Sequence, residues 1–366
     1  MSIMKSFLRS QVALLLLLFA IVPARTAEPA KPASPAPAAP AAAATDEADK
    51  AWAEVLKASQ PPPVRPPPEE LNRLLDNAID KNRDFYTRFP DHAKATEARK
   101  NEYDYVNLLV NQYGDTNRAP RLAELKKALL NDPKLSEDDR FDLRVQETVQ
   151  SAVSKESQGK AAMRTEFEKG IRQLQKEFPK RGEIYEMLLD VASGSDPDHA
   201  RVLAHEVVAS TAPDGVKESA QGFLKRLDMI GKPISIKFDA VDGHAVDLQK
   251  LRGKVVLVDF WATWCGPCVA EMPHVKAAFD KLHGKGFEII GVSLDQQKSE
   301  LTKFVADNHL AWPQFFDGKG WENNLARQYG ITSIPSMMLV DKKGVLRDLS
   351  GGDELAEKVE KLLAEK

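Results

Sequence analysis

The chain has 366 residues, of which 43% are hydrophobic and 29% are charged, and its formal net charge is -3. This length allows two or three domains, and the composition is ordinary for a soluble globular protein. The small negative charge, with no basic stripe and interleaved aromatic residues, argues against nucleic-acid binding.

The first residues have the pattern of a targeting segment. Lys5 and Arg9 form a positive start, and residues 12–22 form an apolar core of eleven residues. That core is too short to span a bilayer comfortably, which favours a signal peptide over residues 1–24. We therefore expect an exported protein, or one that is tethered by this segment where it is not cleaved.

Residues 25–68 are dominated by alanine and proline. Twelve of the 23 prolines lie between residues 23 and 68. Such a composition cannot bury a core and is typical of an extended, semi-rigid linker. Within it, residues 46–59 with Trp52 are either a short helix or disordered, and the sequence leaves both interpretations open.

Residues 69–230 are predicted to form an all-helical domain of about eight helices in antiparallel hairpins. Apolar residues recur there at helical spacing, as at Leu71, Leu75 and Ala78. Helices are expected to end at Phe89-Pro90 and at Phe178-Pro179. These two similar segments indicate either a degenerate tetratricopeptide-type repeat, with a concave surface for a protein partner, or plain helix termination.

Residues 231–366 alternate strand and helix patterns, which predicts an α/β domain with a central mixed sheet. The expected elements are a hairpin over 234–248, strands over 254–260, 287–294, 336–340 and 345–349, and helices over 266–283, 298–309, 322–329 and 353–365. Because the boundary at residue 231 follows a complete helix, we expect residues 231–366 to fold without the residues before them.

The only two cysteines, Cys265 and Cys268, are separated by two residues between a buried strand and a helix. Pro267 suits the first turn of that helix, so Cys265 should lie at the helix N-terminus, where a thiolate is stabilised. Cys268 is one turn further on, close enough for a disulfide. Zinc would need two more ligands, and no other cysteine exists. Attachment of a c-type haem would require His at position 269, where the chain has Val. A purely structural disulfide would stabilise the fold little, because so short a loop constrains the unfolded chain little. A peroxiredoxin would require Thr at position 262, where the chain has Ala.

The segment Trp264-Cys265-Gly266-Pro267-Cys268 resembles the active site of the thioredoxin superfamily. Glu271-Met272-Pro273 narrows the resemblance to its TlpA/ResA-type branch of exported thiol-disulfide reductases. The resemblance covers residues 231–366. It implies a thioredoxin-like fold and a thiol-disulfide oxidoreductase of the bacterial periplasm, with the Cys265-Cys268 disulfide in place of any cofactor or metal. Thioredoxin, which also has Gly-Pro between its cysteines, has a reduction potential of about -270 mV, so this resemblance favours a reductant over an oxidant.

The resemblance also implies roles for the surrounding residues. Pro335 matches the superfamily's cis-proline, and the backbone of Ile334 would pair with substrate. Asp259 and Glu271 are the two candidates for an acid that accepts the proton of Cys268. Asp259 is favoured, because an acid inside an apolar strand needs a reason. Trp264, Gly266 and Pro267 would line the substrate groove. The implied partners are disulfide-containing proteins and a dithiol electron donor, which could be embedded in the membrane; the alternatives are a helical adaptor that mainly docks partners, or a peroxidase.

Overall fold

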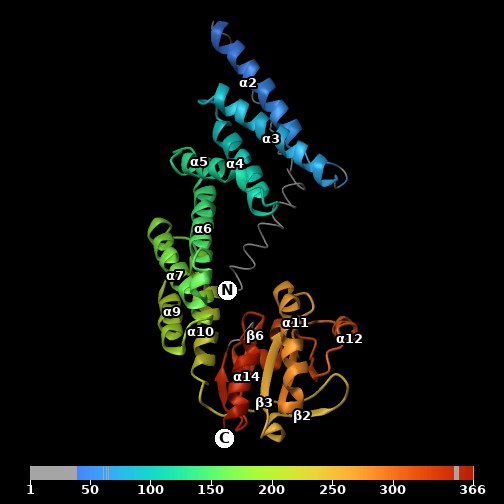
Figure 1. Ribbon diagram of the computed structural model, residues 1–366. Coiled ribbons are helices and arrows are strands. Elements are labelled where there is room, and N and C mark those ends of the chain that lie inside the picture. Colours follow the sequence, from blue (N-terminus) through green and yellow to red (C-terminus); the bar gives the residue numbers. More distant parts are fainter. Residues whose placement is uncertain (1–38, 61, 63, 65, 350–353, 366) are drawn as a thin grey trace, which may run out of the picture. The chain divides into compact units, whose positions relative to one another are not determined.

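The computed structural model describes residues 39–365 except 61, 63, 65 and 350–353 (Figure 1). The predicted signal peptide and the first part of the predicted linker lie outside the described residues. The described chain divides into two compact units, with the division between Gln150 and Ser151.

The first unit is helical throughout its packed core. Its helices are α2 (Ala39–Ala58), α3 (Pro68–Arg88), α4 (Ala95–Asn111), α5 (Ala119–Leu130) and most of α6 (Glu137–Val153). Consecutive helices pack on each other from α2 to α5. Their buried apolar residues recur at helical spacing, which is the pattern that predicts this all-helical region.

Helix α2 differs from the extended linker that the alanine-proline composition predicts. Ala48, Trp52 and Val55 follow at spacings of four and three, so they form one stripe along the helix. Val55 is buried against α3, and the ring of Trp52 lies 5.1 Å from that of Phe85. This part of the predicted linker is therefore packed structure, and of the two interpretations of residues 46–59 the helix is the one present.

The two Phe-Pro segments share one local conformation. Phe89 ends α3 with φ -126° and ψ 62°, and Phe178 ends α7 (Lys160–Glu177) with φ -130° and ψ 63°. In both, the phenylalanine N–H donates to the carbonyl four residues earlier. The likeness is local, and a helical repeat over the whole region remains a prediction.

The second unit begins with helices and continues into a sheet. Three further helices follow α7: α8 (Glu183–Ser193), α9 (Pro197–Ala209) and α10 (Asp214–Leu227). Each packs on the one before it. Residues 68–227, a fully described stretch, thus hold the eight α-helices that the sequence predicts.

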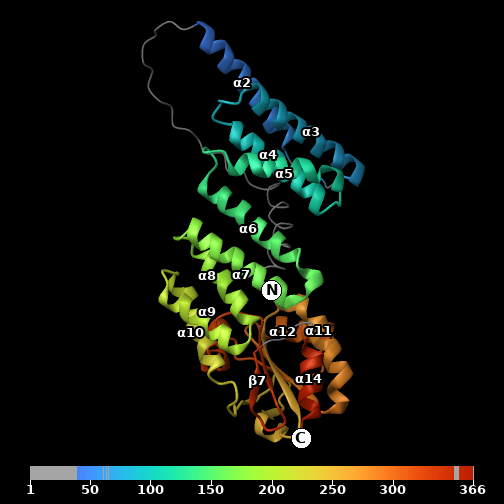
Figure 2. The ribbon, with the colours of Figure 1, turned by 60° about the vertical axis from the view of Figure 1, so that its left-hand side comes forward.

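The sheet has the mixed topology of a thioredoxin-like fold (Figures 1 and 2). Its strands run in the order β5-β4-β3-β6-β7. Central strand β3 pairs parallel with β4 and antiparallel with β6. The strands are β3 (Val255–Trp261), β4 (Phe287–Ser293), β5 (Gln314–Phe315), β6 (Ser336–Val340) and β7 (Leu346–Asp348). All residues of β3 are buried, which explains its continuous apolar run.

Helices and a separate hairpin complete this fold. The hairpin is β1 (Lys237–Asp239) with β2 (Ala245–Asp247), and the helices are α11 (Gly266–Leu282), α12 (Lys298–Asp307), α13 (Asn324–Tyr329) and α14 (Leu355–Ala364). Helices α11 and α14 contact each other, and they pack on β4 and β3 respectively. Helix α11, which follows the first cysteine, is thus supported by both the sheet and the C-terminal helix.

The chain around residue 231 belongs to the same packed unit on both sides. The N–H of Gly231 donates to the carbonyl of Leu346, and the N–H of Leu346 donates to the carbonyl of Lys232. Helix α10 contacts α13. Residues on the two sides of the boundary predicted at 231 are therefore in direct contact. Independent folding of residues 231–366 remains a prediction.

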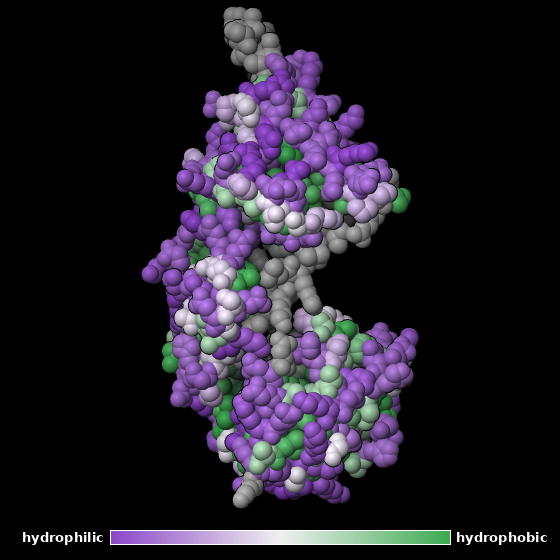
Figure 3. Space-filling model, in the orientation of Figure 1, coloured by the Kyte–Doolittle hydropathy of each residue, from purple (hydrophilic) through white to green (hydrophobic). Residues whose placement is uncertain are grey.

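No helix within the described residues is both long enough and apolar enough to cross a bilayer. The face of the molecule drawn in Figure 3 is mostly hydrophilic, with hydrophobic side chains in scattered patches.

Candidate active site

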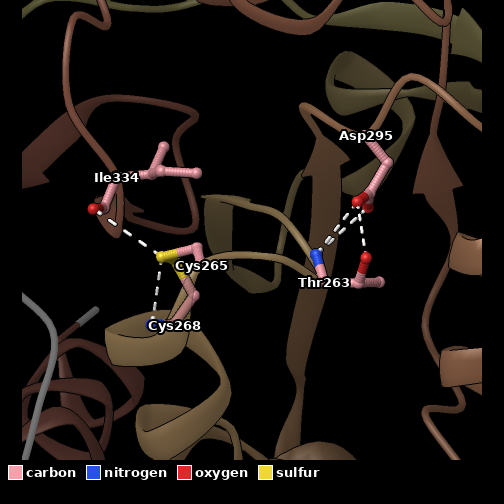
Figure 4. Close-up of a disulfide and its surroundings, with 5 residues drawn as sticks. All are labelled: Thr263, Cys265, Cys268, Asp295 and Ile334. Atoms are coloured by element: carbon pink, nitrogen blue, oxygen red, sulfur yellow. Dashed lines mark hydrogen bonds between the residues drawn. A yellow bond between two sulfur atoms is a disulfide. The ribbon is translucent and has the colours of Figure 1, made fainter. Parts of the chain in front are cut away.

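Strand β3 and helix α11 hold the two cysteines at the turn between them. Cys265 is the residue before α11, and Pro267 lies in the helix's first turn, where no N–H is needed. The two cysteines form a disulfide with a Cα–Cα distance of 5.2 Å. The backbone N–H of Cys268 points at Sγ of Cys265, with N and Sγ 3.2 Å apart (Figure 4). In the reduced protein this N–H and the helix dipole would stabilise a thiolate on Cys265.

A groove of about 380 Å³ opens beside Cys265. It is lined by the predicted groove residues and by four others: Trp264, Cys265, Gly266, Pro267, Trp321, Thr332, Ser333 and Ile334. Cys268 does not line this groove and is only 2% exposed. A substrate in the groove would therefore meet Cys265 first.

Two exposed tryptophans line the groove. Trp264 is 53% exposed and Trp321 is 46% exposed, unusually high values for the largest apolar side chain. Their ring centroids are 6.0 Å apart, in an edge-to-face arrangement. Exposed aromatic side chains of this kind are the ones that anchor partners at protein interfaces.

The loop before β6 forms the side of the groove that faces Cys265. The Ile334–Pro335 peptide bond is cis, the geometry that the resemblance implies. The carbonyl oxygen of Ile334 lies 3.8 Å from Sγ of Cys265 (Figure 4). The backbone of this loop, which lines the groove, can offer hydrogen-bonding groups to an extended substrate segment.

Asp259 lies in the middle of β3 and is 2% exposed. Its Oδ1 has no hydrogen-bond partner among the described residues. Burial raises the pKa of Asp259 to about 7, and the negative charge of Glu271 on α11 contributes to the increase. The structure therefore couples the two predicted acids electrostatically. Glu271 is half-buried, which differs from a solvated helix residue.

Sequence reasoning missed a buried carboxylate that fixes the chain ahead of Cys265. Asp295 is fully buried, and it accepts hydrogen bonds from the backbone N–H of Thr263 at 3.1 Å and from its hydroxyl at 2.7 Å (Figure 4). Ser293 donates to the other oxygen of Asp295. An acid directly after a buried strand was the available signal, but nothing in the sequence pairs it with Thr263.

Among the residues that the structure describes, no group of three or more His, Cys, Asp or Glu side chains could hold a metal ion.

Comparison with known proteins places this site in a family of redox proteins. Residues 208–364 match the Redoxin family. Thiol-disulfide oxidoreductase ResA of Bacillus thuringiensis (strain Al Hakam) is 34% identical over 144 residues, which are 38% of this chain and 81% of that protein. The ResA of Bacillus thuringiensis subsp. konkukian is 33% identical over 123 residues, 34% of this chain and 69% of that protein.

A solved structure is also similar to the C-terminal part of the chain. It is the crystal structure of the thioredoxin domain of a thiol-disulfide oxidoreductase from Bacteroides vulgatus. The two share 31% sequence identity and a TM-score of 0.34, and the match covers 37% of this chain and 97% of that chain.

Proposed function

Because the chain belongs to the family of ResA-type thiol-disulfide oxidoreductases, we propose that it acts as a reductant of protein disulfides in the bacterial periplasm. The observation that carries the proposal is the unequal placement of the two sulfurs. Both are buried, but Cys265, 6% exposed, lines the groove at the N-terminus of α11, whereas Cys268, 2% exposed, does not line it. The Gly-Pro dipeptide between them, as in thioredoxin, favours the reducing direction.

The reaction proceeds by two thiol-disulfide exchanges. The Cys265 thiolate attacks one sulfur of the substrate disulfide, a mixed disulfide forms, and the other substrate sulfur leaves as a thiolate. The Cys268 thiolate then attacks Sγ of Cys265, which closes the disulfide seen here and releases the second substrate thiolate. Two electrons pass to the substrate, and a dithiol donor restores the reduced pair.

The second exchange requires Cys268 to lose its proton in a buried place. Asp259 is our candidate for the group that accepts it, because its raised pKa of about 7 lets its carboxylate hold a proton near neutral pH. The charge of Glu271 helps to raise that pKa. Glu271 is the alternative acceptor, since it follows Cys268 by one helical turn.

The lining of the groove favours protein substrates whose disulfide lies on an accessible, partly apolar segment. Trp264 and Trp321 offer aromatic surface, and the loop at Ile334 offers backbone groups. The positively charged start and apolar core of residues 1–24 support export. In that compartment the electron donor would be another dithiol protein, which could be membrane-embedded.

Insulin reduction with dithiothreitol as donor tests the proposal. We expect the wild-type protein to reduce insulin, Cys265→Ser to be inactive, and Cys268→Ser to accumulate a mixed disulfide with substrate. An adaptor that only docks partners would bind substrate without reducing it. If iodoacetamide at neutral pH labels Cys268 before Cys265 in the reduced protein, the assignment of the attacking sulfur is wrong.

A further inference from the structure

Helix α10 approaches the groove-forming loop too closely for ordinary side chains. Gly222 of α10 lies against Gly330, the left-handed residue that ends α13 with φ 65°. A Cβ at Gly222 would lie 2.4 Å from the carbonyl oxygen of Gly330 and 3.4 Å from the methyl group of Thr332. Real Cβ atoms do not come as close to a backbone oxygen as 2.4 Å, so this contact depends on a glycine.

One turn further along α10, Arg226 reaches the same carbonyl. Its side chain is 6% exposed, and its guanidinium donates a hydrogen bond to the oxygen of Gly330. No carboxylate within the described part of the chain pairs with it. Burial lowers the pKa of Arg226 to about 10, which leaves it charged at neutral pH. The guanidinium also lies over the ring of Phe223, 5.7 Å from its centroid. A buried charge without a carboxylate partner is unfavourable for stability, which is consistent with a positioning role for Arg226.

The anchored carbonyl lies two residues before the groove. Ile331 is buried, and its N–H donates to the carbonyl of Ala326 at 2.8 Å. Thr332 and Ser333 are exposed and line the groove together with Ile334. Ile334 packs against the core, whereas Thr332 and Ser333 have little packing of their own, so the position of these two residues depends on the anchor at Gly330.

We propose that α10 is a positioning element for the substrate groove: Gly222 and Arg226 fix Gly330, and through it the Thr332–Ile334 side of the groove beside Cys265. The helix precedes the first strand of the α/β fold in the chain, and in this proposal it sets the spacing between the loop and the attacking sulfur. The proposal deepens the proposed reductase function, on which it rests, by assigning residues that hold the substrate's binding surface.

Two glycines of α10 provide a matched test. Gly222→Ala places a Cβ against Gly330, whereas a Cβ at Gly215 meets nothing within 4 Å. In the full chain, well below its melting temperature, we expect Gly222→Ala to raise KM for insulin at least about tenfold with little change in kcat, because a displaced binding surface weakens uniform binding. Hydroxyethyl disulfide reaches Cys265 but has no peptide segment to bind along the Thr332–Ile334 side of the groove, so it should be reduced at the wild-type rate. Gly215→Ala should match wild type in both assays.

Amide hydrogen exchange gives a readout that needs no activity. We expect the amide of Ile331, which donates to the carbonyl of Ala326, to exchange at least about threefold faster in Gly222→Ala than in Gly215→Ala. Equal exchange, or faster exchange with an unchanged KM for insulin, would overturn the proposal. If the wild-type protein reduces neither substrate, the proposed function fails, and exchange alone decides whether α10 positions the loop.

Arg226 supplies a second variant in case Gly222→Ala does not fold. Arg226→Met keeps most of the side-chain volume and removes the donor to Gly330. We expect the same rise in KM and in exchange, and partial recovery in Arg226→Lys, which restores one donor. A variant Arg226→Met that matches wild type in both measurements would also overturn the proposal.

Discussion

Replacing Asp259 by Asn should change how the stability of the second unit depends on pH. Burial raises the pKa of Asp259 from its ordinary 3.8 to about 7. The folded chain therefore keeps this proton to higher pH than the unfolded chain does. The contribution of Asp259 to the free energy of unfolding should therefore fall by ~4 kcal/mol as pH rises from about 4 to about 7 and then level off, because each pH unit between the two pKa values is worth ~1.4 kcal/mol.

Asparagine has nearly the same shape and does not titrate, so this fall should be absent in Asp259→Asn. Any cost of burying the amide is the same at every pH. The difference between the two proteins should therefore grow by ~4 kcal/mol in favour of the variant between pH 4 and pH 8. This change with pH, and not the difference at one pH, is the quantity to measure.

Urea unfolding followed by tryptophan fluorescence measures it. Four of the five tryptophans lie between residues 261 and 321, so a Trp52→Phe background confines the signal to the second unit. Asp239→Asn, at an exposed position of β1, is the matched control and should track the parent at every pH. Parallel pH profiles for the parent and for Asp259→Asn would refute the raised pKa and the role built on it.

Two more predictions concern the proton acceptor and the groove. In single-turnover experiments we expect Asp259→Ala to slow release of the mixed disulfide about a hundredfold and to leave the first attack unchanged; no loss there, with a large loss in Glu271→Ala, would transfer the role to Glu271. We expect Trp321→Ala to raise KM for insulin about fivefold, from the loss of aromatic contact, without slowing hydroxyethyl disulfide reduction. Trp52→Phe, in the first unit, should leave both rates unchanged, and an unaltered KM in Trp321→Ala would exclude that residue from substrate binding.

Local patterns predicted most of the fold. The apolar run expected as a strand over 254–260 is β3 (Val255–Trp261), since a strand buried on both faces needs apolar residues throughout. The helices between 68 and 227 follow from helical spacing and Phe-Pro ends. The prediction of an extended linker over residues 25–68 was wrong for α2. It relied on the alanine-proline content and gave too little weight to the apolar residues at helical spacing by which α2 packs on α3.

The candidate site was predictable only where it is contiguous in sequence. The cysteine motif carries its own turn and helix start, and Asp259 was conspicuous as an acid inside an apolar strand. The hydrogen bond from Thr263 to Asp295 spans 32 residues, and that from Arg226 to Gly330 spans 104. Pairings at such separations are set by tertiary packing, and no spacing in the sequence indicates them.

The raised pKa of Asp259 has two consequences of equal size: it destabilises the fold, and it makes proton transfer from Cys268 less unfavourable. An ordinary thiol has a pKa of about 8.5, so transfer of its proton to a carboxylate of ordinary pKa would be uphill by ~6 kcal/mol. With the pKa of Asp259 at about 7, the same transfer is uphill by only ~2 kcal/mol. The ~4 kcal/mol that separates these figures is the free energy by which the ionised carboxylate destabilises the fold. A neutral residue at 259 would therefore give a more stable protein and, for the same reason, a poorer acceptor for the proton of Cys268.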